Sequence, residues 1–328
     1  MFTLKKIDTE LLNQQAFRLI LLEQIRNQSS SFYMSYPHVD KVIMSQYLLK
    51  SMEYNLKNEV KQYWLFEDSF QFIVGESFVS PFDYEHFGFN IIWLNIVLGP
   101  STVESQSAYK RLFNHMINNI NYDKPALFIA RLNIVFIGAI QSLETLKFRF
   151  YETNAYTVRS TEDDVVSTKP IQYSLATDSN IQIISKMAKD HNFQGSHLHL
   201  NDNIPKSKVD LMYQKWIENV HNQLNGYILL MDYKETPAGY FTFSVDDELN
   251  QALGYGLAKT GIIGLSKTFS GKGLGSDLIL GGIKVAKDQG ATFIDSSYSL
   301  NNQASSRLHQ NMGFKTIGHS MTLHRWMN

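Results

Sequence analysis

A glycine-rich turn near the end of the chain constrains the fold more than any other feature of the sequence. The run Ser270-Gly271-Lys272-Gly273-Leu274-Gly275-Ser276 follows an apolar segment that ends at Leu265, and an amphipathic pattern follows it. Because glycine has no Cβ, alternating glycines let successive backbone N–H groups point into one concavity. The next helix adds its unpaired donors and the positive end of its dipole. The pattern therefore predicts a strand, a turn that binds a pyrophosphate, and a helix.

Glycine-rich turns also occur for structural reasons alone, and two nucleotide-binding turns are alternatives. A dinucleotide-binding turn lies early in a βαβ unit and has an acidic residue about 20 positions further on. Here the turn comes late in the chain, after a predicted antiparallel hairpin. A P-loop needs Gly-Lys-Ser/Thr, which Gly271-Lys272-Gly273 does not supply. Both nucleotide alternatives are therefore disfavoured.

A second motif follows the turn, after one predicted strand. It is formed by Asn302, Leu308, Gly313 and Phe314. Together the two motifs resemble the GNAT (GCN5-related N-acetyltransferase) family, whose pattern is Arg/Gln-x-x-Gly-x-Gly/Ala followed by Asn-x-x-Ala-x-x-Leu-Tyr-x-x-x-Gly-Phe. The sequence departs from that pattern at Ser270, Ser305 and His309. Two motifs in the right order are more specific than either one alone.

The resemblance implies a mixed α/β fold and an enzyme that moves an acetyl or other acyl group from acetyl-CoA to an amine. It implies no metal. The turn's amides would hold the pyrophosphate, and the strand end at Leu265 would pair with the pantetheine arm. The expected cofactor-binding residues are Leu265, Ser266, Ser270, Gly271, Lys272, Gly273, Leu274, Gly275, Ser276 and Asn302.

The expected catalytic residue is His309, which stands where the family often has a tyrosine that protonates the departing thiolate. An imidazole with an ordinary pKa of about 6.5 is suited to that role near neutral pH. The alternative is an exposed helix residue without a role. The general base stays unknown. Asp246, Asp247 and Glu248 are the nearest acidic residues in sequence, in a predicted turn where acidic residues are usually just solvated.

The first half resembles an incomplete copy of the same fold. Val97-Leu98-Gly99-Pro100-Ser101 offers one glycine where a phosphate-binding turn needs several, so we expect no CoA there. From about Pro81 onward the sequence resembles two-domain sugar N-acyltransferases similar to dTDP-fucosamine acetyltransferase. The residues that carry this likeness are Phe82 to Phe89, Ala130 to Leu132, Ile204-Pro205 and Lys215 to Asn219. A nucleotide-linked amino-deoxy sugar is therefore the expected acceptor.

His197 and His199 lie in a region that borders the acceptor in this family, and they are the expected substrate-binding residues, with a solvated loop as the alternative. A metal site is disfavoured because no third ligand with suitable spacing is visible. Two alternatives to the amino-sugar function stay open. The acceptor could be a protein N-terminus, a polyamine, an antibiotic or an amino acid, or the chain could bind CoA without catalysis.

A chain of 328 residues exceeds the usual size of one core, which predicts two domains, at 1–165 and 166–328. The polar run Ser160 to Asp164 is the expected linker. We expect an amphipathic helix over residues 1–26, a turn at Phe82 to Phe89 and one strand from Leu253 to Phe269. Because Leu143 to Phe148 follows a helix much as His309 to Phe314 does, an internal repeat is also an open alternative.

The formal net charge of −1, with scattered Lys and Arg, predicts no nucleic-acid partner. The chain has no cysteine, which fits a reducing compartment, so cytoplasm is the expected location. The longest apolar stretch, Ala126 to Ile140, contains Arg131 and is shorter than a membrane helix, so no membrane span is expected. The expected partner is a small amine, and a homodimer is possible.

Overall fold

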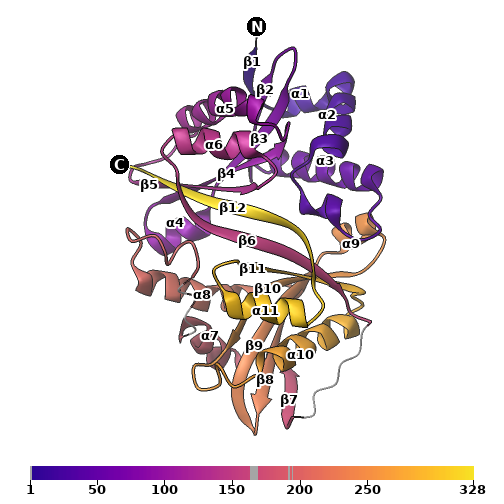
Figure 1. Cartoon of the computed structure of the whole chain (residues 1–328), viewed down its shortest axis with the longest axis vertical. Coiled ribbons are helices and arrows are strands. Elements are labelled where there is room, and N and C mark those ends of the chain that lie inside the picture. The colour runs from indigo at the N-terminus through magenta and orange to yellow at the C-terminus, as the bar shows by residue number, and fades with distance from the viewer. Residues whose placement is uncertain (1, 163–168, 191–192, 194) are drawn as a thin grey trace. The chain divides into compact units, whose positions relative to one another are not determined.

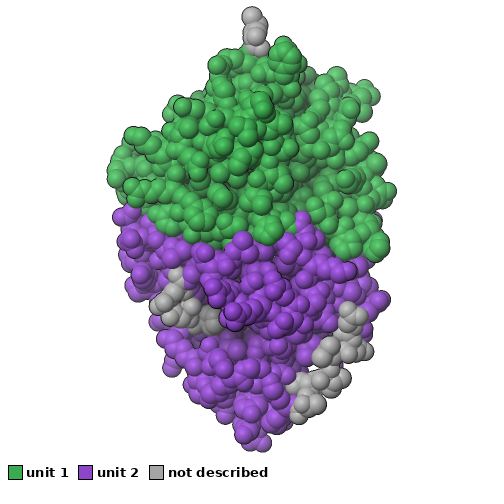
Figure 2. Space-filling model, viewed as in Figure 1, with its two compact units in different colours: residues 1–154, 318–328 green, residues 155–317 purple. Residues whose placement is uncertain are grey.

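The computed structural model describes residues 2–162, 169–190, 193 and 195–328 of the chain. It divides into two compact units (Figures 1 and 2), and each is described by itself. Unit 1 comprises Met1–Asn154 and Gly318–Asn328, and unit 2 comprises Ala155–Ile317. The expected boundary near Val165 lies outside the described residues. The last eleven residues belong to unit 1, although sequence reasoning placed them in the second domain, and the division into folding domains stays a prediction.

Unit 1 is a mixed sheet with helices on both faces. Its strands lie in the order β1-β2-β3-β4-β5-β12, in which β4 and β5 are parallel and the other neighbouring pairs are antiparallel. The strands are β1 (Thr3–Ile7), β2 (Gln62–Glu67), β3 (Phe72–Val79), β4 (Asn90–Leu98), β5 (Ala126–Asn133) and β12 (Lys315–Met327). The α-helices are α1 (Thr9–Asn13), α2 (Gln15–Gln28), α3 (Lys41–Lys57), α4 (Pro81–Phe87), α5 (Gln106–Asn119) and α6 (Ile137–Thr145).

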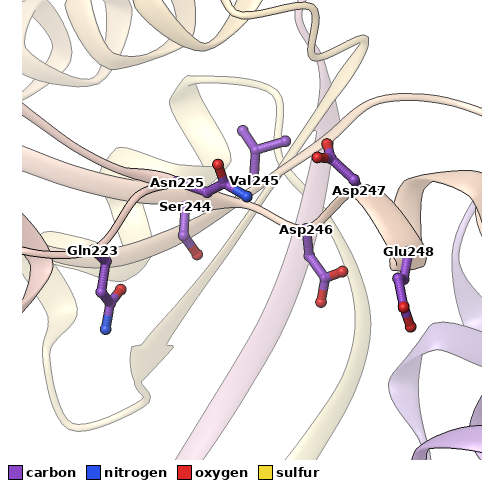
Figure 3. Close-up of a pocket in the computed structure, with 7 residues that line it drawn as sticks. All are labelled: Gln223, Asn225, Ser244, Val245, Asp246, Asp247 and Glu248. Carbon is purple, nitrogen blue, oxygen red and sulfur yellow. The ribbon is translucent and has the colours of Figure 1, made fainter.

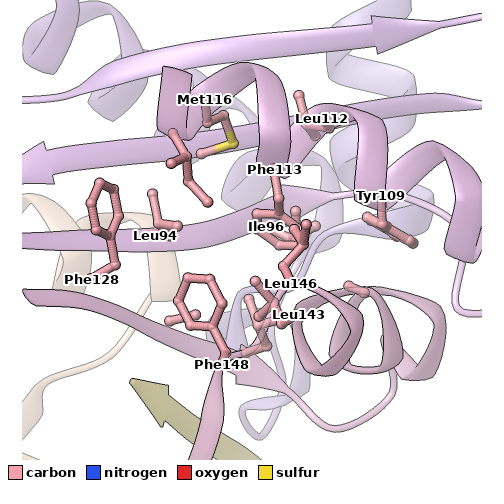
Figure 4. Close-up of a cluster of buried hydrophobic side chains, with 14 of the residues drawn as sticks. Leu94, Ile96, Tyr109, Leu112, Phe113, Met116, Phe128, Leu143, Leu146 and Phe148 are labelled. Carbon is pink, nitrogen blue, oxygen red and sulfur yellow. The ribbon is translucent and has the colours of Figure 1, made fainter. Parts of the chain in front are cut away.

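Side chains of β2 alternate between the two faces of the sheet, which explains why a hydrophobic core lies on each face. Trp64 and Phe66 pack into the cluster under α5 and α6, whereas Tyr63 and Leu65 pack against α2 and α3. Because successive side chains of a strand point to opposite faces, a sheet that is covered on both faces needs continuous apolar strands. Figure 4 shows the first of these clusters, with side chains from α5, α6 and β4 in contact.

Unit 2 repeats the strand order of unit 1. Its order is β7-β8-β9-β10-β11, where β10 and β11 are parallel and the other pairs are antiparallel, and β6 lies next to β11. The strands are β6 (Arg149–Ser160), β7 (Ile171–Leu175), β8 (Gly226–Tyr233), β9 (Thr236–Val245), β10 (Leu257–Leu265) and β11 (Phe293–Ser299). The helices are α7 (Ile181–Asp190), α8 (Lys206–His221), α9 (Asp247–Leu253), α10 (Gly275–Asp288) and α11 (Gln303–Asn311).

Each face of the unit 2 sheet packs against different helices. Phe241 and Phe243 of β9 lie in one core with Leu278 and Ile283 of α10. Gly282 lets α10 approach closely, because a Cβ there would lie 2.7 Å from the Phe241 ring. Tyr240 points to the opposite face, on the side of α7 and α8. The result is the mixed α/β arrangement that the sequence predicted.

Three expectations about local structure were wrong. Residues 1–26 begin with strand β1, because Thr3 to Ile7 pairs with β2, and two helices follow. Phe82 to Phe89 is mostly helix α4, which Ser80 caps, Pro81 begins and Gly88 ends at φ 78°. The expected strand from Leu253 is shorter, because Gly254 at φ 78° ends helix α9 and β10 starts only at Leu257.

The part of the chain that the structure describes contains no helix with the length and apolarity needed to cross a membrane.

Candidate functional site

Strands β10 and β11 pair only over their first residues. The register runs from Leu257↔Phe293 to Lys259↔Asp295 and stops there in the described chain, although β10 continues to Leu265 and β11 to Ser299. Asp295 ends the pairing, since its Oδ1 accepts from the Thr260 N–H at 3.0 Å and thus takes the place of a strand partner. The two parallel strands therefore part in the middle of the sheet.

A bulge in β10 lies next to this point. The register of β10 with β9 shifts between Thr260 and Ile263. The Thr242 hydroxyl of β9 accepts from the Ile262 N–H at 2.8 Å and donates to the Ile262 carbonyl at 3.1 Å. Gly261 is needed here because a Cβ would lie 2.4 Å from that hydroxyl. One buried threonine therefore supplies both hydrogen bonds that the bulge removes from the ladder.

The glycine-rich turn follows the end of β10. Gly271 and Gly273 have φ of 75° and 72°, Lys272 between them is not in that region, and Leu274 has φ −93°. Gly273 and Leu274 are a left-handed and a right-handed residue in succession, and such a pair turns successive N–H groups to one side to form an anion-binding concavity called a nest. The Lys272 N–H instead donates to the Phe269 carbonyl at 3.4 Å. A Cβ on Gly271 or Gly273 would meet nothing within 4 Å, so backbone conformation, not crowding, requires glycine.

The nest leads into α10, whose first N–H groups have no acceptor within the helix. Gly275 begins this helix, and a Cβ there would lie 3.0 Å from Leu308 of α11. The two sequence motifs therefore meet in space. Asn302 caps α11, with its Oδ1 accepting from the Ser305 N–H at 3.0 Å, so a cofactor contact from Asn302 would have to use its other polar atoms. Leu265 and Ser266 lie where β10 leaves β9, and the Ser266 N–H donates to Ala238.

His309 is a buried residue, so the reading as an exposed helix residue was wrong. It is 3% exposed. Its Nδ1 lies 2.8 Å from the Ser305 carbonyl and its Nε2 lies 2.8 Å from the Ser296 hydroxyl. Because a carbonyl only accepts, Nδ1 carries a hydrogen, and in the neutral ring Nε2 accepts from Ser296. Burial lowers the pKa of His309 below the usual histidine range, although the bond to Ser305 acts in the opposite direction.

Ser296 links His309 to the point where the strands part. It is the residue after Asp295, at which the pairing of β11 with β10 ends, and it is 5% exposed. Its carbonyl accepts from the Thr157 hydroxyl at 2.9 Å, which fixes its backbone. The hydroxyl of Ser296 and the ring of His309 therefore form a short hydrogen-bonded path at this point. The catalytic role of His309 stays a prediction.

The two histidines expected to bind the acceptor are both buried. His199 is 4% exposed and uses both ring nitrogens, since Nε2 lies 2.9 Å from Asp210 Oδ1 and Nδ1 lies 3.0 Å from the Ser196 hydroxyl. The carboxylate accepts from Nε2–H, so in the neutral ring Nδ1 accepts from Ser196. His197 is 8% exposed. Ser196 and Asp210 are half-buried and thus more exposed than the two histidines, and substrate contact by the histidines stays a prediction.

The acidic residues that sequence reasoning placed in a turn begin helix α9 instead. Asp246 caps it by accepting from the Leu249 N–H at 3.0 Å, and Asp247 and Glu248 lie in its first turn. Negative charge is favourable at a helix N-terminus, which explains the cluster without a catalytic role. The three line a cavity of about 450 Å³ with Gln223, Asn225, Ser244 and Val245 (Figure 3).

This cavity lies at the far end of β10 from the glycine-rich turn. Val245, in the cavity wall, pairs with Ala258 at the start of β10, whereas Leu265 at its end pairs with Gly239. Seven residues of extended strand separate the two ends by about 23 Å. In Figure 3 the side chains of Ser244 and Asp246 point to one side of the strand and that of Asp247 to the other. The cavity and the turn are therefore separate places.

Sequence reasoning missed five residues that shape this site: Thr242, Thr260, Asp295, Ser296 and Lys169. Lys169 Nζ donates to the Gly273 carbonyl and to Asp277 Oδ2, each at 2.7 Å. These contacts join residues far apart in sequence, 104 positions for Lys169 and Gly273, so no local pattern reveals them. The polar run Asp295-Ser296-Ser297 within a buried strand was the one available signal.

The corresponding place in unit 1 is filled by the chain itself. Strands β4 and β5 pair in parallel from Asn90↔Ala126 to Leu94↔Ala130. Beyond that point Ser29 forms an antiparallel bridge with Leu98, and the Ser30 N–H donates to the Val97 carbonyl at 2.9 Å. Asn133 Nδ2 of β5 lies 3.4 Å from the Ser30 carbonyl. The segment 28–30 thus lies between the ends of β4 and β5.

The turn after β4 is also closed. A Cβ on Gly99 would lie 2.5 Å from the Tyr109 hydroxyl, which donates to the Pro100 carbonyl at 2.7 Å. Proline has no N–H to offer an anion. Tyr109 is fully buried. The Tyr109 hydroxyl therefore occupies the space next to Gly99 and Pro100.

Comparison with known proteins agrees with this geometry. Residues 194–314 match the Acetyltransferase (GNAT) family. The match contains β10, the glycine-rich turn, α10, β11 and α11, and unit 2 therefore has the GNAT fold. A search of curated proteins found no match.

Three solved structures show the likeness of the whole chain to GNAT proteins. A GCN5-related N-acetyltransferase from Sphaerobacter thermophilus is 9% identical, with a TM-score of 0.58 over 99% of this chain and 95% of that one. A tandem GNAT protein from the clavulanic acid biosynthesis pathway is 10% identical, with a TM-score of 0.51 over 99% and 98%. A GCN5-related glucosamine N-acetyltransferase region of a fungal multi-domain β-N-acetylglucosaminidase is 11% identical, with a TM-score of 0.60 over 99% and 38%. At these identities the likeness shows the fold alone.

The bulge of the GNAT unit gives a first test. We expect Thr242→Val to lower the free energy of unfolding by about 2 kcal/mol, because it leaves the buried Ile262 N–H and carbonyl without their partner. Thr242→Ser keeps the hydroxyl and is the matched control, with a smaller loss. Urea unfolding measures both variants. A Thr242→Val protein that is as stable as the native one would show that the hydroxyl does not support the bulge.

Proposed function

We propose that the GNAT unit transfers an acetyl or other short acyl group from acetyl-CoA to an amine. The observation that carries the proposal is the nest at Gly273 and Leu274, which follows the end of the strand that parts from its parallel neighbour. The nest and the start of α10 offer backbone donors to a diphosphate. Beyond Lys259, β10 stays paired with β9, whereas its register with β11 stops in the described chain. The β11 side of this part of β10 is the proposed place for an extended amide-containing arm. The match to the GNAT family supports the same donor.

The chemistry needs the acceptor amine to arrive neutral and aligned with the thioester. The amine nitrogen forms a bond to the carbonyl carbon, the carbon–sulfur bond breaks, and the amine gives up a proton to water. We propose that the departing thiolate receives its proton from the Ser296 hydroxyl, while the His309 imidazolium returns one to Ser296 through Nε2. This route fits the 2.8 Å contact between Nε2 and the Ser296 hydroxyl and the burial of both residues.

Unit 1 is proposed to hold no donor. Its segment 28–30 lies where an extended arm would lie, and Tyr109 closes the turn where a diphosphate would bind.

The proposed acceptor is an amino sugar, in particular a nucleotide-linked amino-deoxy sugar. The sequence resemblance to sugar N-acyltransferases supports it, and one solved structure of similar fold is named as a glucosamine N-acetyltransferase region. The proposed location is the cytoplasm.

Titration with acetyl-CoA tests the donor. We expect one molecule to bind per chain, since the nest seen among the described residues lies in unit 2, and we expect Gly273→Val to weaken binding at least 100-fold. Valine cannot adopt φ 72° without strain, so the turn would lose its arrangement of donors. Gly290→Val is the matched control, because Gly290 has φ 85° and equally open surroundings at the other end of α10. Equal loss in both variants, or two molecules bound per chain, would contradict the assignment.

The dependence of turnover on pH tests His309. Since burial lowers its pKa, the imidazolium is the minor form at pH 7, and it becomes more populated as pH falls. We expect the rate of the acyl-transfer step to rise from pH 8 towards pH 6 when the acceptor is kept saturating. The rise should be absent in His309→Gln, which can still bond to Ser296 and Ser305. A profile that is the same in both proteins would remove His309 from the proton path.

A panel of amines tests the acceptor. We expect release of free thiol from acetyl-CoA with nucleotide 4-amino-4,6-dideoxy sugars or glucosamine, and little release with spermidine or a peptide N-terminus. Turnover on the non-sugar amines alone would contradict the proposed sugar acceptor, but it would still support N-acyltransferase activity. Tight binding of acetyl-CoA without turnover on any amine would point to a binding module.

A further inference from the structure

Lys169 reaches from the start of β7 to the glycine-rich turn of unit 2. Its Nζ lies 2.7 Å from the Gly273 carbonyl oxygen and 2.7 Å from Asp277 Oδ2. The lysine side chain is 41% exposed, whereas that of Asp277 is only 7% exposed. One cation therefore joins the turn to an almost buried carboxylate in the first turn of α10.

The bond to Gly273 fixes the direction of one donor in the nest. In a trans peptide the carbonyl and the following N–H point in opposite directions. Because Lys169 holds the Gly273 carbonyl, the Leu274 N–H is turned away from Lys169. Rotation of this peptide would remove one of the donors in the concavity.

The ion pair with Asp277 changes the net charge next to the glycine-rich turn. Asp277 is the third residue of α10, where a carboxylate interacts favourably with the positive end of the helix dipole. A diphosphate at the nest would compete for that same positive end and would be repelled by an uncompensated carboxylate nearby. Asp277 is therefore an obstacle to anion binding unless its charge is neutralised.

We propose that Lys169 is a positioning residue that makes the turn able to bind a diphosphate, by neutralising Asp277 and by holding the Gly273 peptide. The inference rests on the proposed function, because it concerns the same donor. It implies a preference for donors that carry the diphosphate, such as free CoA thioesters, over an acyl-pantetheine without one.

Contacts other than those of Lys169 also hold β7 against α10. The Tyr173 hydroxyl of β7 donates to the Asp277 carbonyl at 2.7 Å. The same ring lies against Gly281, where a Cβ would be 2.3 Å from it. These contacts hold β7 and α10 together without Lys169. Its removal should therefore change the charge near the turn more than the packing of the unit.

The experiment compares the native protein with Lys169→Met, Lys169→Arg, Asp277→Asn and the double variant Lys169→Met with Asp277→Asn. CoA binding is measured by calorimetry and pantetheine binding by competition. We expect Lys169→Met to weaken CoA binding about tenfold, the order expected for one uncompensated charge near a protein surface. Pantetheine, which has no phosphate, should bind within about twofold of native. Lys169→Arg should stay within about threefold for CoA.

The double variant separates charge from folding. If the buried carboxylate is the obstacle, Asp277→Asn should recover most of the CoA binding that Lys169→Met loses. Lys284→Met, which removes a positive charge from an exposed position further along α10, is the matched control and should bind CoA as the native protein does. Thermal unfolding confirms that each variant is folded.

The outcomes are distinct. If the native protein does not bind CoA, the proposed function fails and this inference with it. If the native protein binds CoA and Lys169→Met binds it equally well, only the inference fails. Equal losses for CoA and pantetheine, or no recovery in the double variant, would also overturn it.

Discussion

The end of pairing between β10 and β11 is the constraint on which the rest of the site depends. A strand that loses its neighbour inside a sheet leaves backbone groups without partners, which is costly unless other groups replace them. Asp295 replaces the partner of the Thr260 N–H, and Thr242 replaces both partners of Ile262. The sheet can therefore stay open at this point in a stable fold. The glycine-rich turn follows one of the two strands, and Ser296 lies on the other.

The two units share a strand order but differ at the point where their two parallel strands stop pairing. Each has four strands in antiparallel succession, a helical crossover and a parallel fifth strand. This shared order supports the internal repeat that the sequence left open. In unit 1, residues 28–30 take the place beside β4, and Tyr109 fills the turn after it. In unit 2, Gly271 and Gly273 keep the turn open. The difference lies in a few side chains, not in the topology.

The sequence could predict the features that are local. The glycine spacing, the helix that follows it and the second motif are each contained in a short run of residues, and the mixed α/β class follows from the alternation of strand and helix patterns. Strand β1 was missed because a short segment takes its conformation from pairing with β2, not from its own propensity. The contacts of Lys169 and Asp295 were missed because both depend on distant partners. His309 was found by its position in a motif, but its burial depends on how α11 packs against β11.

The division of the chain also limits how the units can be studied. Unit 1 includes the last eleven residues, and unit 2 includes residues 155–160 of β6. In unit 2, Ala155 and Val158 are buried, and Thr161 bonds to Thr292 and Ala291. A cut near residue 165 would remove these residues from unit 2 and the paired strand β12 from unit 1. Loss of activity after such a cut would result from disruption of both sheets, so it would not reveal the role of the first half. Point substitutions such as those at Gly273 and Lys169 leave both sheets whole, so they can separate cofactor binding from folding where truncation cannot.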